Sequence, residues 1–281
     1  LSVGLMTAQR VFYTSLEVQL NQQAAELLTA DLEFATNSVF KSSDVERLEA
    51  MLPAFNVSER HIYSTMVQTD TNQTRLVEMV AVESNYPLRG NCTARNADNV
   101  VQSLQTVLDA APNAVVIAKA LADQTQLTIG STVTIGDFVG TVTGIIQDEP
   151  DISVQSLRLG PRLYIRLSNS VKTGFDKQLS RHYQSRLYAF ERPTDALDVV
   201  VPIQAAFGIN PDSGRIQGSF GPSQPLVIRS YQDVSTSVMD GFNDVLQFFI
   251  ILTLFMMILS ALNTIANIQG PTLLIGWTYI I

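Results

Sequence analysis

Short runs of hydrophobic residues with two different periods alternate along the first third of the chain. Three runs are rich in the β-branched and apolar residues typical of strands: 31–34, 62–69 and 76–82. The polar residues 70–74 separate the last two runs and favour a hairpin turn. The segment between the first two runs has a helical period instead, with Ser43 and Glu46 at the spacing of a capping box and Pro53 as its stop. The pattern predicts a β-α-β-β unit over residues 31–82.

The middle of the chain predicts a small β-rich region. A helical period over residues 97–112 ends at a proline. Residues 114–146 then show the pattern of a strand, a short helix and a hairpin, whose turn Gly136-Asp137 suits the primed type because glycine tolerates positive φ. Small or apolar residues follow at every second position, which predicts that they share one face of a strand: Phe138, Gly140, Val142, Gly144 and Ile146. Residues 162–167 predict a further strand.

Strand patterns continue to residue 230. They occur at 185–191, 198–203 and 225–230, and a loop rich in glycine, serine and proline lies over residues 210–224. Ser230 and Asp233 then have the spacing of a helix cap, and apolar residues recur at helical spacing from Val234 onward. We therefore expect a helix that begins after Ser230 and continues into the hydrophobic run that follows.

That hydrophobic run, residues 245–262, has no charged side chain. As a helix its eighteen residues would extend about 27 Å, close to the thickness of a membrane's hydrocarbon core, so a transmembrane helix is predicted. Leu1–Met6 resembles the end of another hydrophobic segment, and an amphipathic period follows it. We expect two stalk helices, Phe12–Leu28 and Tyr231–Leu262, on either side of a polar region that lies outside the cytoplasm. A proline at Val238 is expected to interrupt the second helix.

Composition and motifs argue against most kinds of chemistry. With 18 Lys and Arg against 26 Asp and Glu, the net charge of −8 disfavours nucleic-acid binding. Cys92 is the single cysteine, which excludes an intrachain disulfide, and His61 and His182 are too far apart in sequence to suggest a metal site. We expect these histidines to be packed or on the surface. The sequence contains neither a P-loop nor a Gly-x-Ser-x-Gly elbow.

The remaining charged candidates are expected to be structural. Three carboxylates near a proline predict a solvated turn: Asp148, Glu149 and Asp151. Four arginines are expected to form ion pairs at the surface: Arg89, Arg158, Arg162 and Arg166. We therefore predict no catalytic residue, no cofactor-binding residue and no metal ligand. A hydrolase would require residues that are distant in sequence to converge.

Six segments, in order, resemble permease subunits of the MacB/FtsX-like ABC transporter superfamily, particularly its YbbP-like branch. They are 23–34 (QAAELLTADLEF), 76–90 (LVEMVAVESNYPLRG), 114–146, 149–151 (EPD), 159–174 (LGPRLYIRLSNSVKTG) and the hydrophobic helix that precedes 263–268 (NTIANI). The resemblance implies an α+β fold: an extracytoplasmic mixed β/α porter-type layer with an inserted β-rich subdomain, flanked by stalk helices and a transmembrane α-helix.

The same resemblance implies boundaries along the chain. These are a first membrane and stalk helix (1–30), a first porter-like β/α segment (31–90), the inserted subdomain (91–180), a second porter-like segment (181–230), a stalk and transmembrane helix (231–268) and an atypical tail (269–281). The family has a charged loop that contacts the ATPase after its second membrane helix, whereas this tail carries no charge. A fragment and a frameshifted product are both compatible with this departure.

The implied function is that of a non-catalytic permease subunit of an export or lipid/lipoprotein-extraction system. Such a subunit lies in the bacterial inner membrane with its large domain periplasmic or extracellular, forms a homodimer, and contacts membrane lipid and a hydrophobic or lipoprotein cargo. A separate cytoplasmic ABC ATPase hydrolyses ATP, and no cofactor is implied. The alternative is a membrane-anchored binding or sensing module without transport.

Overall fold

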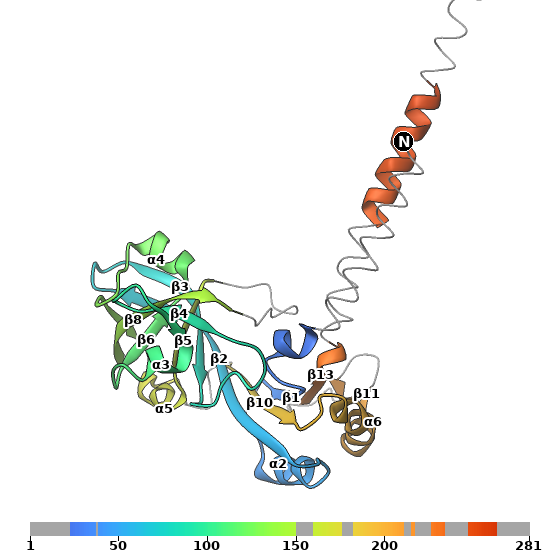
Figure 1. Cartoon of the computed structure of the whole chain (residues 1–281), viewed down its shortest axis with the longest axis horizontal. Coiled ribbons are helices and arrows are strands. Elements are labelled where there is room, and N and C mark those ends of the chain that lie inside the picture. The colour runs from blue at the N-terminus through green and yellow to red at the C-terminus, as the bar shows by residue number, and fades with distance from the viewer. Residues whose placement is uncertain are drawn as a thin grey trace, which may run out of the picture. The chain divides into compact units, whose positions relative to one another are not determined.

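The computed structural model describes residues 23–37, 39–149, 160–175, 182–210, 215–216, 226–233 and 247–262. Gln22–Val234 forms one compact unit, and a second unit comprises Leu1–Asn21 and Ser235–Ile281. In the first unit, the described strands form one continuous mixed sheet against which short helices pack (Figure 1). A mixed α/β fold was predicted and is confirmed.

The sheet follows the order β11-β12-β13-β1-β10-β2-β3-β9-β6-β8-β4-β5, with β7 paired to both β2 and β8. Its strands are β1 (Leu32–Thr36), β2 (Phe55–Thr69), β3 (Thr74–Val82), β4 (Thr93–Arg95), β5 (Val101–Ser103), β6 (Ala114–Ile117), β7 (Thr132–Ile135), β8 (Phe138–Asp148), β9 (Arg162–Arg166), β10 (His182–Phe190), β11 (Ile209–Asn210), β12 (Arg215–Ile216) and β13 (Leu226–Ser230). The helices are α2 (Ser42–Glu49), α3 (Leu104–Leu108), α4 (Lys119–Thr125), α5 (Leu167–Ser170), the 3-10 helix η1 (Val171–Thr173) and α6 (Asp195–Phe207).

One half of the unit is an antiparallel layer covered by two helices. Strands β13, β1, β10 and the beginning of β2 lie side by side. Alternate residues of these strands, including Phe34 and Tyr188, pack with Leu48 of α2 and Ile203 of α6. Burial of these apolar side chains holds both helices on one face of the layer.

The other half is a closed barrel. The pairings run β2–β3–β9–β6–β8–β7 and return to β2, so the strands complete a ring. The side chains that fill its interior come from alternate positions, as expected for strands: Val67, Val77, Met79, Val115, Ile117, Val133, Phe138 and Leu163. Because β2 is long enough to pair with β10 at one end and β7 at the other, it belongs to both halves.

The hairpin around Gly136 and the alternating burial along β8 were predicted correctly. The prediction that Phe138 and Ile146 share one face of the strand is wrong. Gly136 has a φ of +57°, as the turn requires. Phe138 packs into the barrel interior, whereas Ile146 packs into a different core outside it. The pairing of β8 with β6 shifts register between Val115 and Val116, and such a bulge rotates the following residues to the opposite face.

The structure corrects three predictions for segments that contain helices. Residues 198–203, predicted as a strand, lie within helix α6, where Ala196, Val200 and Ile203 are buried on one side. Tertiary burial of this face outweighs the strand propensity of the valines. Residues 97–112 contain the short strand β5 before α3, which is capped by the Ser103 side chain. Helix α2 begins after Lys41 without a side-chain cap, so the predicted Ser43 box is wrong.

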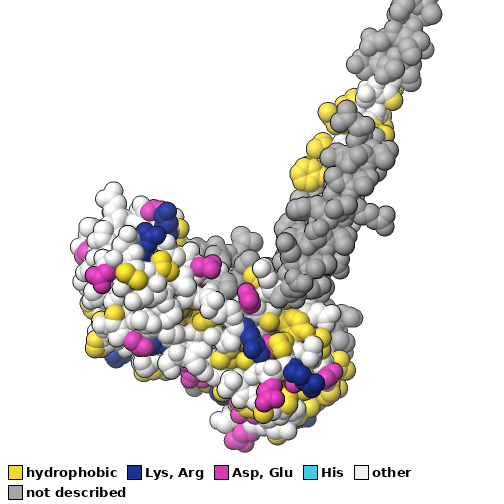
Figure 2. Space-filling view, in the orientation of Figure 1, with side chains coloured by type: hydrophobic (Ala, Val, Ile, Leu, Met, Phe, Trp, Pro, Cys, Tyr) yellow, Lys and Arg dark blue, Asp and Glu magenta, His cyan; other side chains and the backbone are white. Residues whose placement is uncertain are grey.

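The predicted membrane helix lies only partly within the described residues. Residues 247–262 are helical, and their large apolar side chains are exposed (Figure 2). Within the described stretches of the chain, helices of sufficient length and hydrophobicity to cross a membrane are not found. The rest of the predicted stalk, including Val238, lies outside the described residues. The predicted boundaries at 90 and 180 stay a prediction.

Candidate functional site: the junction of the flanking helices

The two ends of the compact unit meet at neighbouring strands. Helical residues 23–28 lead into β1, and β13 leads into helical residues 231–233. Strands β1 and β13 are paired antiparallel with Leu32 opposite Ser230, and the Tyr231 N–H donates to the Asp31 carbonyl at 3.1 Å. Segment 23–28 therefore ends, and segment 231–233 begins, at the same place on the sheet (Figure 1). We call this place, residues 28–31 and 230–233, the junction.

Asp31 lies at the centre of the junction and is fully buried. Its carboxylate accepts two hydrogen bonds from the Arg89 guanidinium, Nε at 3.0 Å and Nη2 at 2.7 Å, and one from the Phe190 N–H at 2.8 Å. Bidentate, charge-assisted hydrogen bonds of this kind are both stronger and more directional than neutral ones. The hydrogen bond to Asp31 also raises the pKa of Arg89.

Arg89 belongs to a loop, residues 83–92, that we call the strap. Next to the junction, the N–H groups of Leu88 and Arg89 both donate to the Thr29 carbonyl at 3.1 Å. Gly90 has a φ of +72°, and a Cβ at this position would lie 3.1 Å from the Glu26 Cβ. Glycine at this position therefore allows the strap to lie directly against helical residues 23–28.

The opposite end of the strap is tied to the barrel half. The Gln105 side chain, at the start of α3, donates to the carbonyls of Tyr86 and Glu83, the latter at 3.1 Å. Arg166 donates to the side chain and the carbonyl of Gln105 and also pairs with Asp109. The strap thus spans from the barrel to the junction, with hydrogen bonds at both ends.

The exit of β13 is fixed by a second buried charge cluster. Glu33 of β1 forms ion pairs with Arg60 of β2 at 2.9 Å and with Arg229 of β13 at 2.7 Å. Tyr183 donates to Glu33 at 3.2 Å, and burial raises the pKa of this tyrosine. The cap predicted at Ser230 is confirmed, since Ser230 N–H donates to the Asp233 carboxylate at 2.6 Å.

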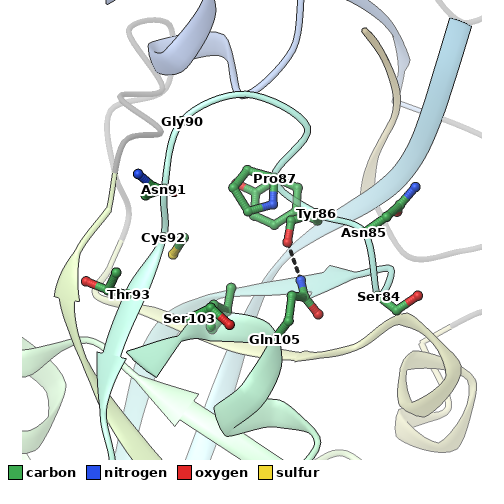
Figure 3. A pocket seen from close by; sticks show the side chains of 11 residues that line it. Ser84, Asn85, Tyr86, Pro87, Gly90, Asn91, Cys92, Thr93, Ser103 and Gln105 are labelled. Carbon is green, nitrogen blue, oxygen red and sulfur yellow. Dashed lines mark hydrogen bonds between the residues drawn. The ribbon is translucent and has the colours of Figure 1, made fainter. Parts of the chain in front are cut away.

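A cavity of about 300 Å³ lies between the strap and the start of α3 (Figure 3). The strap residues Tyr86, Pro87 and Asn91 line it together with Thr93 of β4, and Ser103 and Gln105 line it beside the start of α3. The peptide bond between Tyr86 and Pro87 is cis.

The structure corrects two of the expectations for charged residues. Arg162 is not at the surface: it is 1% exposed and pairs with Glu78 and Glu149, each at 2.5 Å. Glu149 is therefore not in a solvated turn, because the fold brings the end of β8 next to Arg162. Arg89 and Arg166 form ion pairs as expected, although the partner of Arg89 is fully buried.

Two other candidates behave as expected. His61 is packed, with Nε2 at 2.8 Å from Glu59, and Asp148 is exposed. The predictions for Arg158, Asp151 and the His182 side chain concern atoms outside the described residues.

Asp31 was not singled out from the sequence, because one aspartate between a helix and a strand has no distinguishing pattern. Within the described residues, no group of three or more His, Cys, Asp or Glu side chains could hold a metal ion. Charged residues of both signs are interspersed over the face seen in Figure 2. The geometry at the junction is that of a structural connection, built from buried ion pairs and main-chain hydrogen bonds.

These features define a domain that joins a barrel to a helix-covered layer and in which the helical segments 23–28 and 231–233 adjoin the same strand pair. The family model of the MacB-like periplasmic core domain matches residues 2–207, so the chain belongs to that family. It is also 25% identical over 237 residues to the uncharacterized ABC transporter permease YbbP of Escherichia coli (strain K12). That match covers 82% of this chain but only 28% of the permease.

Two solved structures are similar at low identity. One is the periplasmic region of MacB from Actinobacillus actinomycetemcomitans, with 13% identity, a TM-score of 0.44 and coverage of 75% of this chain and 95% of that one. The other is the extracellular domain of the noncanonic ABC-type transporter YknZ from Gram-positive bacteria, with 12% identity, a TM-score of 0.41 and coverage of 63% and 96%.

Proposed function

We propose that the chain belongs to the permease subunit of an ABC-type export or lipid/lipoprotein-extraction system. In this proposal the compact unit lies outside the cytoplasm, the flanking helices enter the cell membrane, and two copies form a homodimer. A cytoplasmic ABC ATPase hydrolyses ATP, and the flanking helices transmit its motion to the domain. The chain itself catalyses no reaction.

The observation that carries this proposal is the arrangement of the junction. Motion of one helix moves the domain only if the connection between them is stiff. Here the end of 23–28 and the start of 231–233 are joined to the same strand pair, and Asp31 contacts both the strap and Tyr231. Charge-assisted hydrogen bonds, and burial from water, make such a connection resistant to local opening.

A direct test uses the complete permease together with its ATPase in lipid nanodiscs. Hydrogen exchange is measured in the nucleotide-free state and after trapping with ATP and vanadate. We expect peptides from 23–37 and 226–233 to change protection together, whereas the α4 peptide 119–125 stays constant as a control. If the ATPase is trapped normally and neither junction peptide changes, transmission through the junction is wrong.

The cavity under the strap favours a second candidate, a membrane-anchored binding module without transport. This candidate predicts a permease chain that binds ligand as a monomer and leaves the ATP hydrolysis rate of every tested ATPase unaltered. Stimulated hydrolysis in the reconstituted complex would exclude it.

A further inference from the structure

Helix α6 covers one face of the layer (Figure 1) and is apolar on its outer side as well. Residues 199–207 are uncharged, and the one polar side chain among them, Gln204, is buried. Val201 is 68% exposed, more than any other large hydrophobic residue described in the compact unit, and Pro202 and Ala205 are exposed too. A helix that is apolar all round is usually covered on both sides. We call Val201, Pro202 and Ala205 the outer face of α6.

Two exposed charges of opposite sign lie at the two ends of the outer face. Asp198 precedes it in α6. Arg47 of α2 lies at the other end, where its guanidinium donates to the Ala206 carbonyl at 2.9 Å and lies 5.2 Å from the centroid of the Phe207 ring. A guanidinium has five N–H donors, so these contacts leave donors that can bind a carboxylate. Because Pro202 has no N–H, the Asp198 carbonyl also lacks its usual donor within the helix.

The charge around the outer face disfavours a membrane surface as its cover. Helices that lie on membranes carry Lys or Arg beside their apolar face. The charged residues of α6 itself are Asp195 and Asp198, and the whole chain has a net charge of −8. An anionic lipid surface would repel this helix, whereas a protein surface with charges of both signs would not.

We propose that the outer face of α6 packs against the same face of a second copy, with the two helices antiparallel. A two-fold contact is self-complementary, so that residues at one end of the face meet residues at the other end. In an antiparallel pair centred on Pro202, each Asp198 lies beside Arg47 of the second copy. The reason is that Asp198 and Ala206, which holds Arg47, are each four residues from Pro202, about 6 Å along the helix axis. A parallel pair would bring like charges together, which is unfavourable at a contact.

This inference rests on the proposed function, in which the permease is a homodimer, and adds the surface through which the two domains touch. The thirteen residues of α6 extend about 20 Å, and a contact one helix wide is smaller than the roughly 800 Å² per partner of a stable interface. We therefore expect the contact only between copies that the membrane already holds together, because their effective concentration is high.

Cross-linking of the complete permease with its ATPase in lipid nanodiscs tests the contact. Val201→Cys places a thiol next to the centre of the antiparallel pair. A short bis-maleimide should therefore link residue 201 of the two copies, and mass spectrometry identifies the linked peptide. Val171→Cys, at a valine of η1 that is 63% exposed, is the control. It should give at least about tenfold less of its own link, because a short linker cannot span two distant sites.

Charge reversal tests the antiparallel arrangement. Asp198→Arg and Arg47→Asp should each reduce the link at residue 201 roughly fivefold, and the double variant should restore it, because the reversed pair again has opposite signs. Asp123→Arg, at an exposed position of α4, changes the net charge by the same amount as Asp198→Arg and should have no effect. A double variant that gives less of the link than either single variant would refute the antiparallel pair.

Native mass spectrometry of the same samples separates this inference from the proposed function. A dimeric permease without the link at residue 201 overturns the α6 contact and leaves the homodimer intact. A monomeric permease overturns both. If the thiol introduced at residue 201 is shielded from a water-soluble maleimide in the dimer without forming the link, another protein or the membrane covers the outer face, and the assignment to a second copy is wrong.

Discussion

The carboxylate of Asp31 is fully buried and depends on Arg89, which is itself 30% exposed. The guanidinium is therefore solvated on one side and fixed by Asp31 on the other. A buried charge without its partner is costly, and so Asp31 and Arg89 stabilise the junction as a pair rather than individually. The same reasoning applies to Arg162, whose two carboxylate partners remove it almost completely from water.

Asp31→Asn should destabilise the full chain by about 2 kcal/mol, because a charge-assisted bidentate pair is replaced by weaker neutral hydrogen bonds. The unfolding free energy in detergent, obtained from denaturant titration, is the measurement. Asp195→Asn is the control: its partner Arg192 is 79% exposed, and the change should stay within about 0.5 kcal/mol. Equal effects of the two variants would show that burial of Asp31 is unimportant.

We expect Glu59 to make a contribution to the free energy of unfolding that depends on pH. Its hydrogen bond with His61 lowers the pKa of Glu59 below the ordinary value of 4.5. The ionised carboxylate therefore stabilises the fold above that value, and the contribution is lost as the pH falls through the folded-state pKa.

Glu59→Gln should accordingly be less stable than the unmodified chain at about pH 5, by up to about 1 kcal/mol, and the difference should shrink toward about pH 3. Thermal unfolding of both chains across this range measures the difference. Glu46→Gln, at an exposed position of α2, should show no such trend. A difference that grows on acidification would contradict the assigned direction of the pKa shift.

At the scale of single elements, packing decides between alternatives that local pattern leaves open. Helix α6 forms from a valine-rich segment because its buried side completes the core under β1 and β10. Strand β8 changes the face it buries at a bulge, where Gly144 lies close to Val107 of α3. Glycines in β8 are therefore sites of close approach between elements, in agreement with the usual meaning of glycine within a strand.

Gly140→Ala should destabilise the barrel by about 1–3 kcal/mol, because a Cβ there would lie 2.4 Å from Val115 Cγ2 and 2.8 Å from Phe138 Cε1. Denaturant unfolding measures the effect. Val139→Ala, at the exposed neighbouring position on the same strand, is the control and should cost less than about 1 kcal/mol. A neutral Gly140→Ala would mean that β6 and β8 can move apart.

At the scale of the whole molecule, the long strand β2 unites two different architectures. Its beginning belongs to the helix-covered layer and its last residues close the barrel. The strap makes a second connection, from Gln105 to Thr29 and Asp31. Two connections in parallel resist relative movement of the halves better than one, as the proposed transmission of motion from the flanking helices would require.

This organisation predicts unequal protection against hydrogen exchange. Strand β6 is paired on both sides, to β8 and β9, whereas β5 is paired only to β4 within the described sheet. Peptides from Ala114–Ile117 should therefore exchange more slowly than those from Val101–Ser103 by a factor of at least about 100. Similar rates for both strands would indicate that the barrel opens as readily as the sheet edge.

The sequence by itself determined the features that depend on neighbouring residues: the hairpin of β2 and β3, the turn at Gly136, strand β9, and the cap formed by Ser230 and Asp233. It also determined the family, through six ordered segments. Five of them lie within residues 2–207, which the family model matches, and the sixth follows in the sequence. Periodicity and turn chemistry are local, and therefore a single sequence carries them.

Only the tertiary structure decided the closure of the barrel, the helical state of α6, the burial of Arg162 and the meeting of both helical segments at Asp31. Each of these depends on contacts between residues far apart in sequence, such as Asp31 with Arg89 and Arg162 with Glu78. The physical reason is that burial and charge pairing are properties of position in space, and a single sequence does not encode such positions in any local pattern.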